Sequence, residues 1–186
     1  MKKITINIVL ALLCLNFPAA QAQPTKTSGK LTVGDQFPVT AIKDIINTKT
    51  TAIDLNKQAK DLVILNFWTT WCSSCIKNFP KEEALQQQFK DRMQLYLVNG
   101  NDGDFKRGVQ IVLDRYKENY GKRLNIPVVY PGDYITNLFR YTSYPHCVWL
   151  NKQGKIIGIT DGEALTAANI EKALRGDPFN LPIKTD

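Results

Sequence analysis

The sequence predicts an α/β fold: a central mixed sheet with a parallel crossover, an antiparallel hairpin, and helices on both faces. Residues 62–68 form an apolar run without charge, as expected for a strand that is covered on both faces. Helix-like and strand-like segments alternate after this run, which implies a right-handed parallel crossover. Apolar segments at residues 146–150 and 155–160 flank a turn that contains Gly154, and this pattern predicts the antiparallel hairpin.

The elements of the first half of the chain are short until the buried strand begins. Residues 33–38 predict an edge element, because their proline has no N–H to donate to a ladder. Residues 50–55 alternate enough to be strand-like. After the strand at residues 62–68, a partial 3.6-residue period predicts a helix that ends at about Lys90 and bends at Pro80.

The second half is expected to contain alternating elements before the hairpin and one helix after it. The loop Asn101–Asp104 should cap the second helix, and Thr166 should cap the last one, which Gly176 ends. The expected elements are a strand at 94–98, a helix at 105–120, a strand at 125–130, a short helix at 135–141, the hairpin, and a helix at 167–174.

Length and composition fit one globular domain. The chain has 186 residues, of which 44% are hydrophobic and 22% charged, so it can build a core without disulfides. The formal net charge is +7, but the lysines are scattered and no basic run or aromatic-interleaved basic stripe is present. This pattern favours a solvated basic surface over a nucleic-acid partner.

The N-terminus predicts export. Residues 1–22 read as a signal peptide: two lysines precede an apolar segment too short for a comfortable membrane span, and a small-x-small site ends at Ala22. Cleavage there would leave the protein in the periplasm or cell envelope, where disulfides persist. An uncleaved membrane anchor is the alternative; lipidation of Cys14 is disfavoured, because Leu13 stands where a lipobox needs a small residue. The expected parts are the signal peptide, a flexible lead-in at 23–31, one domain at 32–176 and a tail at 177–186.

Cys72 and Cys75 are predicted to cycle between dithiol and disulfide. A helix follows the buried strand at once, so Cys72 should lie at a helix N-terminus, where unpaired N–H groups and the helix dipole favour a thiolate. A static disulfide is disfavoured, because so short a loop constrains the unfolded chain little, and zinc would need a second ligand pair. Cys147 is the thiol left over after signal removal; we expect it to be buried and inert, with a third redox partner as the alternative.

The segment Asn66–Cys75, followed by Phe79 and Pro80, resembles the TlpA/ResA branch of the thioredoxin-like thiol–disulfide oxidoreductases. Residues 144–155 are similar to the cis-proline segment and hairpin of the same family, most of all to envelope members from the Bacteroidetes. The resemblance spans about Val33 to Leu174. It implies a thioredoxin fold and an exported domain that exchanges disulfides with other envelope proteins.

The resemblance also implies roles for individual residues. Cys72 would be the attacking thiol and Cys75 the resolving thiol, with Pro145 as a cis-proline that faces them and presents the backbone of Tyr144 to a substrate strand. Trp71 is expected to be exposed beside the thiols. Apart from the redox-active disulfide no cofactor is expected, and electrons would come from a membrane donor.

Two carboxylates of the family are absent. Asn66 stands where many thioredoxins have a buried Asp, and Asn78 where many ResA-like members have Glu. With both carboxylates absent, the resolving thiol has no obvious proton acceptor; Glu82 or Glu83 could act only from further along the helix. His146, next to the cis-proline, titrates near neutrality and is a candidate proton carrier or substrate contact; otherwise it is a strand residue at the groove rim.

The direction of electron flow is inferred from the residues between the cysteines. Ser73 and Ser74 offer hydroxyl groups but no positive charge, which favours a reductant over an oxidant. One rival is a peroxide-reducing redoxin, for which Thr69 and Thr70 are present but no arginine lies close in sequence. The other rival is a thioredoxin-fold binding module in which the thiols are incidental.

Overall fold

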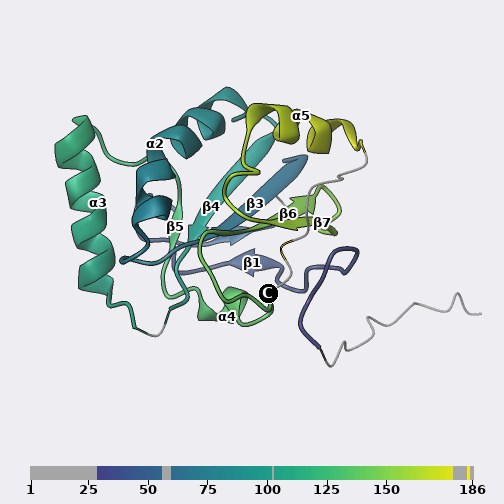
Figure 1. Cartoon of the computed structure of the whole chain (residues 1–186), viewed down its shortest axis with the longest axis horizontal. Coiled ribbons are helices and arrows are strands. Elements are labelled where there is room, and N and C mark those ends of the chain that lie inside the picture. The colour runs from purple at the N-terminus through teal and green to yellow at the C-terminus, as the bar shows by residue number, and fades with distance from the viewer. Residues whose placement is uncertain (1–28, 56–59, 102, 178–183, 185–186) are drawn as a thin grey trace, which may run out of the picture.

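A computed structural model of the chain describes residues 29–55, 60–101, 103–177 and 184. The predicted signal peptide and its cleavage site lie outside the described residues, as does most of the predicted lead-in. No helix in these ranges is long and apolar enough to cross a membrane. The elements run in the order β1 (Ala41–Ile42), β2 (Ile53–Asp54), β3 (Leu62–Phe67), α2 (Ser73–Gln88), β4 (Met93–Val98), α3 (Lys106–Tyr120), β5 (Val128–Val129), α4 (Asp133–Thr136), β6 (His146–Asn151), β7 (Ile156–Thr160) and α5 (Ala167–Arg175) (Figure 1).

The main sheet is mixed, as predicted. Its strand order is β5-β4-β3-β6-β7, and β1 pairs with β2 in a separate two-stranded sheet. The β3–β4 and β4–β5 pairs are parallel, whereas β3–β6 and β6–β7 are antiparallel. All six residues of β3 are buried, since this strand is central and both of its faces are covered. In β3, Asn66 lies opposite Leu97 on one side and Cys147 on the other.

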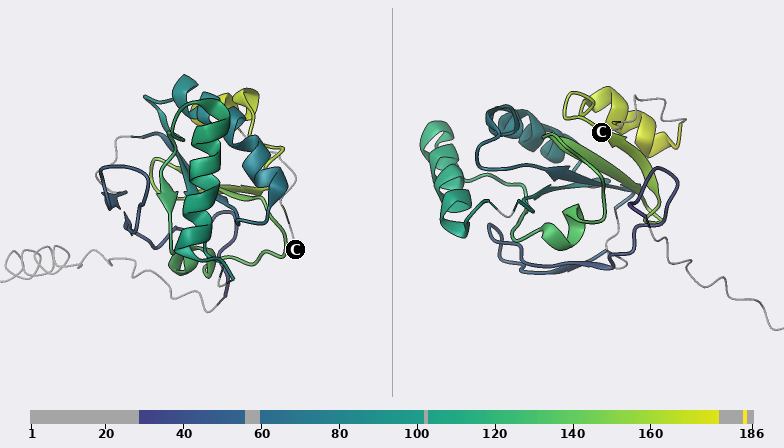
Figure 2. Two further views of the ribbon diagram at one scale, coloured as in Figure 1. Left: turned by 90° about the vertical axis from the view of Figure 1, so that its left-hand side faces the viewer. Right: turned by 60° about the horizontal axis from the view of Figure 1, so that its bottom comes forward.

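Helices cover both faces of the sheet, as predicted. Figures 1 and 2 show α2, α3 and α5 on one face, and α4 together with the N-terminal segment on the other. Each face has its own hydrophobic cluster, and the alternation of side chains along β3 separates them: Ile64 belongs to the first, and Leu65 and Phe67 to the second. Both cysteines of the CxxC pair lie in the cluster under α2.

Most of the predicted elements are confirmed near their expected bounds, but two local predictions are wrong. The short helix α4 begins at Asp133 and ends at Thr136, instead of covering residues 135–141. The loop before α3 does not cap it: the N-cap residue is Phe105, which makes no side-chain capping bond. The Asp104 carboxylate is instead bound by Thr70 and Asn99, so a tertiary contact replaces the local one.

Candidate redox site

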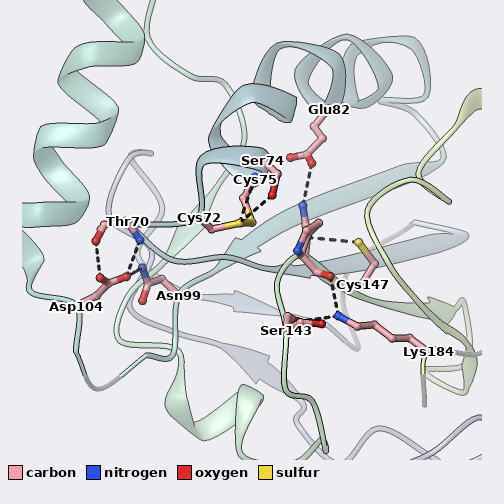
Figure 3. The surroundings of a disulfide bond; sticks show 12 residues. Thr70, Cys72, Ser74, Cys75, Glu82, Asn99, Asp104, Ser143, Cys147 and Lys184 are labelled. Carbon is pink, nitrogen blue, oxygen red and sulfur yellow. Dashed lines mark hydrogen bonds between the residues drawn. A yellow bond between two sulfur atoms is a disulfide. The ribbon is translucent and has the colours of Figure 1, made fainter. Parts of the chain in front are cut away.

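The CxxC pair lies where β3 ends and α2 begins. Cys72 and Cys75 form a disulfide, and their Cα atoms are 5.3 Å apart. Cys72 is the N-cap residue of α2, and its sulfur accepts a hydrogen bond from the backbone N–H of Cys75 at 3.2 Å. The Ser74 hydroxyl lies 3.4 Å from the same sulfur (Figure 3). After reduction this sulfur would occupy the position in which a helix N-terminus stabilises an anion.

The two sulfurs differ in access to solvent. Cys72 is 6% exposed and Cys75 is fully buried. Trp71, the preceding residue, is 65% exposed, so the Cys72 side of the pair faces the surface. This asymmetry fits the predicted order of events, in which an incoming disulfide meets Cys72 first and Cys75 acts from inside.

Aromatic side chains border the disulfide. The ring of Tyr144, from the segment before β6, meets Trp71 edge-on with centroids 5.6 Å apart. Tyr141 contacts Tyr144 in turn, with a ring separation of 5.4 Å. The segment that precedes β6 is thereby brought next to the CxxC pair, although about seventy residues separate them in sequence.

Pro145 has a cis peptide bond to Tyr144, as the family resemblance implies, and Tyr130–Pro131 is cis as well. Two neighbours that sequence analysis did not single out fix the Pro145 segment. A side chain at Gly162 would place a Cβ 2.5 Å from Pro145 Cγ, so only glycine fits there. Lys184, from the expected tail, donates from Nζ to the carbonyl oxygens of Ser143 at 2.7 Å and Pro145 at 3.0 Å (Figure 3).

A buried aspartate ties the loop before the disulfide to the start of α3. Asp104 accepts hydrogen bonds from the Thr70 backbone N–H at 2.8 Å, from the Thr70 hydroxyl, and from the Asn99 side-chain amide at 2.6 Å. The Tyr130 hydroxyl donates to the Asp104 carbonyl oxygen at 2.8 Å. The position of Thr70, two residues before Cys72, is therefore set by a contact across the fold, as Figure 3 shows.

Beneath the disulfide, polar side chains from three elements meet inside the core. Asn66 in β3 donates from Nδ2 to Glu82 Oε1 at 2.9 Å, and Cys147 in β6 donates from Sγ to Asn66 Oδ1 at 3.4 Å. All three are at most 1% exposed. Burial raises the pKa of Glu82 to about 8, against the opposing effects of Lys81 and the Asn66 hydrogen bond. Burial, together with the charges of Glu82 and Asp161, raises the pKa of the Cys147 thiol.

Glu83, next in sequence, is in a different environment. Its carboxylate accepts hydrogen bonds from the Tyr116 hydroxyl at 3.0 Å and the Asn125 N–H at 2.7 Å, and it pairs with Lys122. Burial alone would raise the pKa of Glu83, but these partners outweigh burial and lower it. Glu83 is thus a fixed anion that joins α2 to α3 and the segment after it.

His146 does not lie at a groove rim. It is fully buried, and its ring stacks on Phe67 with centroids 5.2 Å apart. Because successive side chains of β6 alternate between the faces, Cys147 faces α2, while His146 faces the cluster of Phe67, Phe139 and Tyr141 on the opposite side. The expectation of a surface position for His146 is wrong, and this arrangement gives no support to a substrate contact by its side chain.

Cys147 carries no disulfide and is fully buried, so the predicted burial of this thiol is confirmed. The hydrogen bond from Cys147 to Asn66 is not predicted from the sequence. The pairing of β3 with β6 creates this contact, since Asn66 and Cys147 are directly opposite in register. The sequence places Glu82 and Glu83 alike further along the helix from Cys75. The spacing of seven residues between Cys75 and Glu82, which puts both on one face of α2, could have favoured Glu82 over Glu83.

The fold and the disulfide at the start of α2 define a thioredoxin-fold protein with a CxxC pair. The family model described as Redoxin matches residues 32–174, so the chain belongs to the Redoxin family. Two curated Bacillus relatives extend this finding. The chain is 28% identical over 142 residues to the thioredoxin-like protein YneN of Bacillus subtilis, an alignment that covers 76% of this chain and 78% of YneN. It is 25% identical over 171 residues to the thiol-disulfide oxidoreductase ResA of Bacillus thuringiensis, covering 90% and 92% of the two chains.

Solved structures agree on the fold. The thioredoxin domain of a thiol-disulfide oxidoreductase from Bacteroides vulgatus matches with a TM-score of 0.58 at 23% identity, over 78% of this chain and 99% of that domain. A putative thiol:disulfide interchange protein DsbE from Chlorobium tepidum matches with a TM-score of 0.59 at 21% identity, over 79% and 98%. With the curated relatives, these findings make the chain a TlpA/ResA-like member of the family, and its activity class thiol–disulfide oxidoreductase.

Proposed function

We propose that this protein is an exported disulfide reductase that exchanges disulfides with other cell-envelope proteins through Cys72 and Cys75. The observation that carries the proposal is the position of the pair: the Cys72 sulfur caps α2 at the surface side, while Cys75 is enclosed behind it. Reduced Cys72 attacks a substrate disulfide as a thiolate and forms a mixed disulfide. Cys75 then attacks Cys72 and releases the reduced substrate.

The proposed substrates are extended segments of other proteins that carry a disulfide. The exposed Trp71 ring and the adjacent Tyr144 ring offer a broad aromatic surface next to Cys72. Such a surface suits contact with many sequences, because aromatic rings gain most of their binding energy from burial of area and little from a specific hydrogen bond. Pro145, next to Tyr144, belongs to the same proposed substrate-binding segment.

Electron flow from this protein to its substrates is supported by the residues between the cysteines. Ser73 and Ser74 carry no positive charge, and the only described side-chain donor to the Cys72 sulfur is the Ser74 hydroxyl. A strong oxidant owes its potential to a strongly stabilised thiolate, for which the described residues provide the helix N-terminus and the Ser74 hydroxyl but no cationic side chain hydrogen-bonded to the Cys72 sulfur. The reductant would be regenerated by a membrane electron donor, and cleavage of the signal peptide at Ala22 would release the domain into the envelope.

Reduction of insulin disulfides by the mature protein, with dithiothreitol as electron source, tests the proposed activity. We expect insulin precipitation to accelerate with the native chain and to fall to the background rate with Cys72→Ser. Gly29→Ala, where an added Cβ meets open space, serves as the control and should retain activity. Absence of insulin reduction together with peroxide reduction would overturn the proposal in favour of a peroxide-reducing redoxin.

A trapping variant tests the proposed class of partner. Cys75→Ser should accumulate mixed disulfides between Cys72 and envelope proteins, and the double variant that also lacks Cys72 should accumulate none. A Cys75→Ser protein that forms no mixed disulfide in its own envelope would contradict exchange and favour a binding module. Fractionation of cells that express the full chain, with N-terminal sequencing of the product, tests export and cleavage.

A further inference from the structure

Glu82 is a buried acid that forms no salt bridge within the described ranges. It is 1% exposed, and its Oε1 accepts one hydrogen bond, from the neutral amide of Asn66. Oε2 is buried and has no hydrogen-bond partner in the part of the chain that the structure describes. A carboxyl group in such surroundings favours its neutral form, and burial raises the pKa of Glu82 to about 8. Glu82 can therefore gain or lose a proton close to neutral pH.

Glu82 lies on the same face of α2 as Cys75. The two residues are seven positions apart, which is two helical turns, and both are buried beneath the helix. Figure 3 shows both side chains projecting from α2 on the side where Cys147 also lies. Long side chains in helices lean toward the helix N-terminus, which directs the Glu82 carboxyl group back toward Cys75.

The orientation of Asn66 is fixed by a second hydrogen bond. The Cys147 thiol donates to Asn66 Oδ1, so the Asn66 amide hydrogens point away from Cys147 and toward Glu82. Asn66 itself is held in β3 between two strands. The carboxyl group of Glu82 is thus tied to the central strand at the residue six positions before Cys72.

Compared with the charged and titratable groups around it, Glu82 is the acid best suited to exchange a proton with the CxxC pair. Lys81 acts on it from α2 and lowers its pKa, and the Cys147 thiol faces it from β6 through Asn66. The charge of Asp161 raises the pKa of the Cys147 thiol, and the charge of Lys184 lowers it. Glu83 points to Tyr116 and Lys122 instead, and its lowered pKa makes it a weak proton acceptor.

We propose that Glu82 accepts the proton of the Cys75 thiol when Cys75 resolves the mixed disulfide, with Asn66 and Cys147 acting as positioning residues for the carboxyl group. This inference rests on the proposed function, because it assigns a step of the same exchange reaction. It gives the chain a proton acceptor on α2, although neither Asn66 nor Asn78 can accept a proton.

In the reducing direction, two successive attacks pass two electrons from the dithiol to the substrate disulfide. The Cys72 thiolate attacks the substrate disulfide, a Cys72–substrate bond forms, and the first substrate sulfur leaves as a thiolate. Cys75 then transfers its proton to the Glu82 carboxylate and attacks the Cys72 sulfur. The Cys72–Cys75 bond forms, and the second substrate sulfur leaves as a thiolate. Glu82 returns its proton to solvent, and the substrate has gained the two electrons of the dithiol.

A single-turnover reaction with dithionitrobenzoate, an aromatic disulfide with a coloured product, separates the two attacks. With one equivalent of reagent, the reduced protein releases the first nitrothiobenzoate when Cys72 attacks and the second when Cys75 resolves. We expect Glu82→Gln to leave the first phase unchanged and to slow the second at least tenfold, consistent with the usual contribution of a positioned base of about 100-fold or more. The native second phase should accelerate with pH and level off above about pH 8, and Glu82→Gln should lack this inflection.

Glu83→Gln is the matched control, with the same chemical change one residue away, and both of its phases should follow the native protein. An unchanged second phase in Glu82→Gln would overturn the proposal, and so would equal slowing of both phases, which indicates a merely structural role. If Glu82→Gln does not fold, the pH profile of the native protein decides: a second phase without an inflection near pH 8 contradicts the assignment. If the native protein lacks this inflection but reduces insulin, the Glu82 assignment fails and the proposed function stands. If the native protein does not reduce insulin, the proposed function itself fails.

Discussion

Replacing Glu82 by Gln should change how the stability of the protein depends on pH. The pKa of Glu82 is about 4.5 in an unfolded chain and about 8 in the folded protein. Between these two values the folded state holds a proton that the unfolded state has lost. The stability that protonated Glu82 contributes is therefore lost as pH rises from about 4.5 to about 8. Above that range Glu82 causes no further change in the free energy of unfolding.

The magnitude follows from the size of the shift. At about 1.4 kcal/mol per pKa unit, the difference in Glu82 protonation between the folded and unfolded states lowers the stability, relative to acid pH, by about 2 kcal/mol at pH 6 and about 5 kcal/mol at pH 9. The Gln side chain has nearly the same shape and can accept the same bond from Asn66, but it cannot ionise. The stability of Glu82→Gln relative to the native protein should therefore increase by about 3 kcal/mol between pH 6 and pH 9.

Urea unfolding of the oxidised protein, followed by tryptophan fluorescence at several pH values, measures this difference. Every other titrating group is common to both proteins and cancels in the comparison. Glu83→Gln supplies the opposite control: loss of a lowered-pKa carboxylate should destabilise the protein above the acid range and give no gain at high pH. A stability difference between Glu82→Gln and the native protein that stays constant from pH 6 to pH 9 would refute the raised pKa of Glu82.

Other predictions concern the residues that hold the site. Gly162→Ala should destabilise the protein by about 1–3 kcal/mol and slow insulin reduction, because its Cβ would meet Pro145; Gly29→Ala, where the space is open, should do neither in the same assays. Asp104→Asn should lower the free energy of unfolding by about 1–3 kcal/mol, because an amide N–H then faces the Thr70 N–H; unfolding in urea that matches the native protein would contradict this role. Trp71→Ala should raise the KM for insulin, because the exposed ring is lost from the surface beside Cys72. Stability should stay within about 0.5 kcal/mol of the native value, and the first dithionitrobenzoate phase should be unchanged. An unaltered KM would remove Trp71 from the substrate surface.

The sheet was predictable from sequence because its strands have distinct patterns. An uncharged run such as β3 can be stable only with both faces covered, and the hairpin of β6 and β7 has a glycine at its turn, where Gly154 has a φ of 72°. The helix α4 was placed too late. It is only four residues long, and buried contacts of Ile135 and Thr136 decide its position more than any local periodicity does.

The site was predictable only as far as its local part. The CxxC pair at a helix N-terminus follows from the order of strand and helix. Asp104 was assigned to the cap of α3, because its contact with Thr70 joins segments 34 residues apart that no local pattern connects. Similarly, sequence places Glu82 and Glu83 side by side, and only the packing of α2 against β3 and α3 shows that one meets Asn66 and the other Tyr116.

The position of His146 is tied to the alternation of side chains along β6. Neighbouring residues of a strand face opposite sides of a sheet, so His146 and Cys147 cannot both approach the CxxC pair. Cys147 contacts Asn66 on the α2 side, and His146 stacks on Phe67 on the other. Alternation along β6 predicts that only one of these two side chains faces the CxxC pair, and the contact between Cys147 and Asn66 shows which one.

The reduction potential of the Cys72–Cys75 pair decides whether the protein acts as a reductant or an oxidant. Equilibration of the mature protein with glutathione or dithiothreitol buffers of known potential, followed by alkylation and mass measurement, gives the fraction that is oxidised at each potential. A disulfide reductase with a thiolate held by a helix N-terminus and a serine hydroxyl should have a potential near about −270 mV. A potential near about −120 mV, typical of a strong oxidant, would contradict the account.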